Sequence, residues 1–187
     1  MKILLLFLLL DIFGLVPIPA SDANAKFSLN DLYILREKSI LRGNYKDVAS
    51  QSNGAIVSSA RTNLIARPTV ENSPLRNPIY FLVTQQPGHF YVQLHQQIIV
   101  EFLQAYEINR IRFWLLDHDT RIADIQVFII GKDRQTEFSL YDGQLDRGVQ
   151  TLKFPDQLVS KVRFYNKNGN SIDQYMSIIK IQAFYAF

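Results

Sequence analysis

The stretch from residue 98 to residue 121 constrains the fold of this chain more than any other. Residues 98–103 and 108–115 each carry apolar side chains with the two-residue period of a β-strand. Both faces of the first run are largely apolar, which is typical of a strand buried in a core. A short polar link, residues 104–107, separates the runs. The pattern therefore predicts an antiparallel pair of strands at the centre of the core.

A cluster of polar residues follows the second strand directly. It contains Asp117, His118, Asp119 and Arg121, so most of it is ionisable. Three interpretations stay open. As a sugar site, the carboxylates and the guanidinium would hydrogen-bond hydroxyl groups. As a calcium site, two Asp side chains and loop carbonyls would supply oxygen ligands. As a structural unit, Asp117 would cap loop amides while Arg121 pairs with Asp119.

The two strands and the polar cluster resemble the discoidin (coagulation factor type C) domain, most of all the variant appended to BTB/POZ proteins. The residues that carry the resemblance are Gln104, Tyr106, Ile111, Arg112, Asp117, Asp119 and Arg121. Ala105 and Leu116 depart from the pattern, which usually has Pro and Trp there. The resemblance extends more weakly over residues 53–187. It implies an all-β, galactose-binding-like jelly-roll sandwich of roughly eight strands that binds ligands at one rim.

The first 25 residues have the parts of a secretory signal peptide. Lys2 gives a positive start, residues 3–10 form an unbroken apolar run, and Ala23 and Ala25 give a small-residue exit. The run is too short to span a bilayer, which takes about 20 residues. We therefore expect residues 1–25 to be removed and the chain to be exported. Retention of this segment as an apolar strand or anchor is the alternative.

Residues 26–52 are predicted to form an N-terminal extension that contains one helix, over residues 28–42. Ser28 followed by Asp31 is close to a capping box, and Gly43 can end the helix. From residue 53 onward the pattern is that of strands. Besides the central pair, we predict strands at residues 55–57, 79–84, 89–94, 124–130, 137–141, 149–154, 160–165 and 177–184, and a long loop at 58–78.

Each strand of an antiparallel sandwich crosses the domain once, so two loops with an even number of strands between them emerge at the same end. An even number of predicted strands separates loop 60–78 from loop 117–122, and loop 117–122 from loop 166–174, so all three should lie on one rim. We expect a ligand to contact this rim. The candidate ligand-binding residues are Asp117, His118, Asp119, Arg121, Asn168, Asn170 and Tyr175.

The sequence offers little for catalysis. The three His residues share no local ligand spacing, and the chain has no Cys, which excludes thiol chemistry. No Gly-x-Ser-x-Gly elbow and no phosphate-binding glycine loop is present. We therefore expect a non-enzyme without a cofactor, calcium being the weakest of the three interpretations.

The charge and the composition of the chain limit the classes of partner that we expect it to bind. A net charge of +3 with scattered basic residues argues against nucleic acid. We predict a secreted or secretory-lumen binding module for a glycan, a lipid surface or a protein. The alternative is a structural subunit of a larger intracellular or organellar assembly, which the missing Cys also fits.

Overall fold

In the computed structural model the chain divides into two units, Met1–Ile34 and Leu35–Phe187. The structure describes Asn30 and residues 33–34, 47–63, 73–76 and 88–186. In the first unit the described residues are helical. The predicted signal peptide and most of the predicted helix 28–42 lie outside the described residues. No helix within the described ranges is long and apolar enough to cross a membrane.

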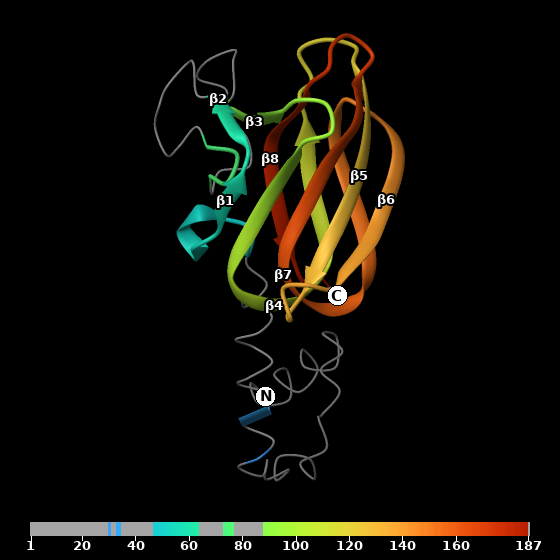
Figure 1. Cartoon of the computed structure of the whole chain (residues 1–187). Coiled ribbons are helices and arrows are strands. Elements are labelled where there is room, and N and C mark those ends of the chain that lie inside the picture. Colours follow the sequence, from blue (N-terminus) through green and yellow to red (C-terminus); the bar gives the residue numbers. More distant parts are fainter. Residues whose placement is uncertain (1–29, 31–32, 35–46, 64–72, 77–87, 187) are drawn as a thin grey trace, which may run out of the picture. The chain divides into compact units, whose positions relative to one another are not determined.

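The second unit is an antiparallel β-sandwich, which confirms the predicted all-β jelly-roll class (Figure 1). Its strands pair in the order β2-β3-β8-β4-β7-β5-β6, and β1 pairs with β4. Its elements are the 3-10 turn η2 (Gln51–Asn53) and the strands β1 (Ile56–Ser59), β2 (Arg61–Asn63), β3 (His89–Val92), β4 (Gln97–Leu115), β5 (Ile122–Gly131), β6 (Glu137–Asp146), β7 (Gly148–Asn170) and β8 (Met176–Phe184).

The predicted antiparallel pair of residues 98–103 and 108–115 is wrong, because both runs belong to the single bent strand β4. Its partner is β7, which likewise joins the predicted strands 149–154 and 160–165. The ladder breaks its register between Glu101 and Tyr106 on β4, and between Ile108 and Arg110, where β7 bulges around Pro155. Bulges absorb extra residues and bend a strand without ending it. The polar link and the proline are therefore corners of strands and not loops.

These two corners build the two layers of the sandwich. The first half of β4 and the second half of β7 lie in one layer with β1, β5 and β6. The other halves lie in the second layer with β8, β3 and β2. Figure 1 shows β4 and β7 turning from one layer to the other at the bottom of the sandwich.

The core lies between the layers and follows the alternation of the strands. Phe113 and Phe164 are fully buried and meet edge to face, with their ring centroids 5.0 Å apart. Phe102 is buried at the corner of β4. Val48 and Ala49, in the predicted N-terminal extension, are buried in this same core.

Strand β8 is buried on both faces, because residues 47–50 and 74–76 cover its outer side. Trp114, Leu116 and Ile179 form a small apolar cluster there. Lys180 is fully buried beside it and donates to the carbonyl of Arg76, with the Asp47 carboxylate 3.8 Å away. Burial lowers the pKa of Lys180 to about 8.

Other strand boundaries also differ from the prediction. Residues 61–63, which were predicted to lie within the loop 58–78, form β2 against β3. Strand β6 continues through Gly143, which has φ +150° and was predicted to end the strand. The predicted strand 79–84 lies outside the described residues. The predicted strands 89–94, 124–130 and 177–184 are present, with ends that differ by a few residues.

Candidate functional site

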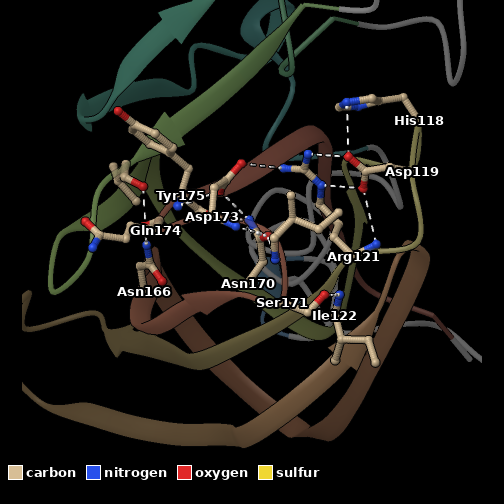
Figure 2. A network of polar contacts seen from close by, with 12 residues as sticks. His118, Asp119, Arg121, Ile122, Asn166, Asn170, Ser171, Asp173, Gln174 and Tyr175 are labelled. Carbon is tan, nitrogen blue, oxygen red and sulfur yellow. Dashed lines mark hydrogen bonds and ion pairs between the residues drawn. The ribbon is translucent and has the colours of Figure 1, made fainter.

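Two loops meet at the end of the sandwich opposite the corners of β4 and β7. They are residues 116–121, which connect β4 to β5, and residues 171–175, which connect β7 to β8. Arg121 joins them, since its Nη1 lies 3.6 Å from Asp173 Oδ2 (Figure 2). A second link is the hydrogen bond from the amide of Ile122 to Ser171 Oγ, at 3.1 Å. The shared rim predicted for these two loops is confirmed. Most of the third loop, 60–78, lies outside the described residues.

Arg121 and Asp119 form the ion-paired unit that the sequence predicted. Arg121 Nε and Nη2 donate to the two carboxylate oxygens of Asp119, at 2.7 and 2.5 Å. Arg121 is 8% exposed, so the pair is shielded on one side. The hydrogen bonds from Arg121 lower the pKa of Asp119 to about 2, and the same contacts raise the pKa of Arg121.

The loop amide is held by Asp119 and not by Asp117, contrary to the prediction. Asp119 Oδ1 accepts from the Arg121 amide at 3.2 Å, whereas no side-chain hydrogen bond of Asp117 is found among the described residues. His118 is 61% exposed, and its Nε2 lies 3.2 Å from Asp119 Oδ2. Asp119 is therefore the central residue of this loop, and the His118 side chain beside it is exposed to solvent.

Asn170 holds the second loop together. Its Nδ2 donates to Asp173 Oδ1 and to the Tyr175 carbonyl, both at 2.6 Å. Its Oδ1 accepts from the amides of Ile172 and Asp173, at 2.8 and 2.9 Å. Because these contacts use both ends of the amide, Asn170 shapes the loop and has little hydrogen-bonding capacity left for a ligand.

Buried Asn166 fastens this loop to its neighbours. Its Nδ2 donates to the carbonyls of Gln174 and Val92, at 2.9 and 3.3 Å. Its Oδ1 accepts from the Gly169 amide at 2.8 Å. The loop 171–175 and the end of β3 are therefore held by one side chain (Figure 2).

A pocket of about 400 Å³ opens between these loops and β3. We call it the tyrosine pocket. Of the residues predicted for the site, it contains His118, Arg121 and Tyr175. It is lined by His89, Tyr91, Leu116, His118, Arg121, Asp173, Tyr175 and Ser177.

Sequence reasoning missed His89 and Tyr91 as site residues. Both project from β3, whose register places Tyr91 opposite Ser177 at the start of β8. The ring of Tyr91 meets that of Tyr175 at 70°, with centroids 5.9 Å apart, and lies 6.0 Å from the ring of His89. A signal was available: Phe90 and Val92 are the buried residues of β3, so alternation turns His89 and Tyr91 away from the core.

Asn168 lies outside the tyrosine pocket. Its Nδ2 donates to Asp124 Oδ2 at 2.6 Å, and it lines a separate, smaller pocket on the same rim. Of the seven residues predicted to bind a ligand, three therefore line the tyrosine pocket, while Asp119 and Asn170 support its walls.

The tyrosine pocket has the makings of a hydrogen-bonding site with aromatic walls. Arg121 presents donors, Asp173 presents acceptors, and two tyrosine rings supply flat apolar surface. In the described part of the chain, no three His, Asp or Glu side chains are placed to share a metal ion. The arrangement suits a small polar ligand that also has an apolar face.

No protein-family model and no curated protein matches this chain. Similar solved structures exist. The CBM32 of AlyQ, in complex with 4,5-unsaturated mannuronic acid, has a TM-score of 0.52 and 17% identity over 70% of this chain and 95% of that one. The family 32 CBM of C. perfringens NanJ, in complex with galactose, has a TM-score of 0.50 and 12% identity over 74% and 97%.

A third similar structure is chitosan-binding module 1 of a chitosanase/glucanase from Paenibacillus sp. IK-5. Its TM-score is 0.50 and its identity 13%, over 74% of this chain and 98% of that one. Likenesses at such low identity are likenesses of fold. They agree with the predicted galactose-binding-like, discoidin-type architecture, whereas the finer resemblance to the BTB/POZ-linked variant stays a prediction. The second unit of this chain therefore has the fold of the CBM32 carbohydrate-binding modules.

Proposed function

We propose that this chain is a non-catalytic carbohydrate-binding module and that its sugar occupies the tyrosine pocket. One observation carries the proposal. Two outward-facing tyrosines lie beside an Arg–Asp pair in a pocket at the loop end of a CBM32-like sandwich. The similar structures favour a glycan over a lipid surface or a protein partner among the ligands we expected.

The chemistry of the pocket fits a sugar ring. A pyranose has an apolar C–H face that can pack on Tyr91 or Tyr175, and hydroxyl groups that both donate and accept hydrogen bonds. Arg121 can donate to a ring hydroxyl while Asp173 accepts from its neighbour, and such charge-assisted bonds are short and directional. His89 and His118 add nitrogen atoms at the mouth of the pocket.

The Asp119 carboxylate, at the centre of this rim, is unsuited to act as the general acid of glycoside hydrolysis. Hydrolysis needs one carboxyl group that remains protonated near neutral pH to act as the general acid. The pKa of Asp119 is lowered to about 2, so this group is ionised at neutral pH. Both Asp119 and Asp173 are engaged with the same guanidinium. We therefore propose that the rim binds the sugar without cleaving it.

We also propose that the chain is exported, since a glycan-binding module meets its ligand outside the cell or in the secretory lumen. The signal-like residues 1–25 support this proposal. Mass spectrometry of the native protein tests it: a mature N-terminus near Lys26 is the expected result. Recovery of the intact N-terminus inside the cell would instead favour the alternative, a structural subunit of an intracellular assembly.

A glycan array tests the proposed function. We expect the wild-type chain to bind at least one class of glycan on the array, and we expect Tyr91→Ala to abolish the signal. The matched control is Tyr165→Ala. Like Tyr91, Tyr165 lies near a histidine ring, since the ring centroids of Tyr165 and His95 are 6.4 Å apart. Unlike Tyr91, Tyr165 is not among the residues that line the tyrosine pocket. Binding that is retained in Tyr91→Ala, or lost only in Tyr165→Ala, would mean that the tyrosine pocket is not the site.

The array also distinguishes the structural alternative. If the wild-type chain binds no glycan, and Tyr91→Ala releases it from a complex with which it co-purifies, the rim is an assembly contact. The proposed function would then be wrong.

A further inference from the structure

We infer that a second pocket beside the tyrosine pocket is an additional sugar subsite, so that the rim binds an oligosaccharide chain and not a single terminal sugar. This inference rests on the proposed function. The second pocket, which we call the asparagine pocket, has a volume of about 210 Å³. It is lined by Ile122, Asp124, Gln144, Asn168, Gly169, Asn170 and Ser171.

The two pockets share a wall. Arg121 lines the tyrosine pocket and the next residue, Ile122, lines the asparagine pocket. Their Cα atoms are about 3.8 Å apart, as in any trans peptide. On the other loop, Ser171 lines one pocket and Asp173 the other, and Asn170 bonds to Asp173 across the wall. Figure 2 shows Asn170 with Asp173 and Arg121 to one side and Ser171 and Ile122 to the other.

The wall is rigid, which is what a chain of linked sugars requires of neighbouring subsites. Asn170 makes four hydrogen bonds within its loop. The hydrogen bond from the Ile122 amide to Ser171 Oγ connects the two loops at the wall itself. The pockets are therefore held at a fixed separation by side chains that already have partners.

Two side-chain amides of the asparagine pocket, those of Asn168 and Gln144, have hydrogen-bonding groups available for the hydroxyl groups of a ligand. Asp124 holds one N–H of Asn168, which leaves the Oδ1 acceptor and the second N–H of this exposed residue for a ligand. Gln144 is exposed, and its side-chain amide makes no hydrogen bond within the described ranges. Both amides can donate and accept, as paired sugar hydroxyls demand.

The pocket also has an apolar element. Ile122 is 40% exposed, although it is a large hydrophobic residue at the rim. An exposed apolar side chain flanked by two amides gives a sugar one surface for its C–H groups and two for its hydroxyls. Across the wall, the tyrosine pocket likewise combines apolar surface, from tyrosine rings, with polar groups, there Arg121 and Asp173.

Titration calorimetry with the full chain tests the inference. The probes are mono-, di- and trisaccharides of three β-1,4-linked series: galactose, mannuronic acid and glucosamine. In any series that binds, we expect the trisaccharide to bind at least about tenfold more tightly than the monosaccharide, which corresponds to about 1.4 kcal/mol. Gln144→Ala and Asn168→Ala should remove this advantage and leave monosaccharide affinity unchanged.

The control is Gln157→Ala, since Gln157 lies at the far end of the sandwich, beside the β5–β6 turn. It should change neither affinity. Gln144→Ala is the decisive variant, because no side-chain hydrogen bond is lost from the folded protein. Equal affinity of wild type for mono- and trisaccharides, or an unchanged trisaccharide affinity in Gln144→Ala, would overturn the second subsite and leave the proposed function standing. Absence of binding in all three series would overturn the inference, and together with a glycan array on which the wild-type chain binds nothing it would also overturn the proposed function.

Discussion

The guanidinium of Arg121 donates two hydrogen bonds to the carboxylate of Asp119, two residues earlier in the chain, at 2.7 and 2.5 Å. It also faces Asp173, on a loop fifty residues away in sequence, at 3.6 Å. One buried cation thus fixes the shape of the β4–β5 loop and joins it to the β7–β8 loop. The walls of the tyrosine pocket depend on this contact.

Acid should weaken the protein through Asp119. The pKa of this group is lowered from 3.8 to about 2 in the folded state. A lowered carboxyl pKa contributes stability that is complete above the unfolded value and is lost as the pH falls through the folded value. The contribution, at most about 2 kcal/mol for a partly exposed group, should therefore disappear between about pH 4 and pH 2.

The measurement is the free energy of unfolding of wild type and Asp119→Asn across this range. The difference between them should shrink as the pH falls. Asp146→Asn is the control, since the Asp146 side chain has no hydrogen bond or ion pair among the described residues, and its difference from wild type should stay small. If the free energies of unfolding of wild type and Asp119→Asn differ by the same amount at every pH, the lowered pKa of Asp119 does not contribute to stability.

Substitution of Asn170 should destabilise the protein more than substitution of Asn168, although the two residues lie two positions apart. Asn170→Ala removes four hydrogen bonds and leaves loop amides without acceptors, which should cost about 2–3 kcal/mol. Asn168→Ala removes one contact of an exposed residue and should cost less than about 1 kcal/mol. Denaturant unfolding of both variants measures this. Equal costs would mean that Asn170 does not organise the loop.

Gly169→Ala should destabilise the protein for two reasons. Its φ of +76° disfavours any residue with a Cβ, and a Cβ there would lie 2.8 Å from the Asp173 carbonyl oxygen. Gly148 has φ +87° and no atom within 4 Å of such a Cβ. Gly148→Ala therefore reports the backbone cost alone, about 1 kcal/mol. Thermal unfolding should show a clearly larger loss for Gly169→Ala, and equal losses would exclude the steric contribution.

Phe113→Ala should cost about 3–5 kcal/mol, as truncation of a fully buried phenylalanine does. It would also remove the edge-to-face contact with Phe164. Phe138 is 45% exposed, and Phe138→Ala should cost less than about 1 kcal/mol. Urea unfolding of the two variants compares them directly. A small loss for Phe113→Ala would place it outside the core.

Alternation of apolar residues predicted where most strands lie, but not how they join. The link at Gln104 and the Pro155–Asp156 pair have the composition of turns, so each long strand was predicted as two. A bulge and a turn use the same residue types, and only the partner strand decides which one forms. Each half of β4 and of β7 still crosses the sandwich once. The number of crossings between the loops 117–122 and 166–174 is therefore unchanged and even, and the prediction that both loops lie on one rim was correct.

The site was predicted only as far as local sequence allows. Asp119 and Arg121 are two residues apart, so their pairing could be read from the chain. His89 and Tyr91 enter the pocket through the pairing of β3 with β8, which joins residues more than eighty positions apart. The role of Asn170 depends on the fold of its own loop, where neighbouring amides compete with any ligand for the same side chain.

The location of the bound sugar decides whether the tyrosine pocket is the ligand site. Backbone amide resonances of the isotope-labelled full chain would be followed by NMR during titration with the array-positive sugar. Binding in the tyrosine pocket should shift the amides of residues 89–91, 116–121 and 173–177, and leave residues 131–138, at the far end of the sandwich, unchanged. Shifts concentrated at residues 131–138, or no shift at saturating sugar, would mean that the sugar does not bind in the tyrosine pocket.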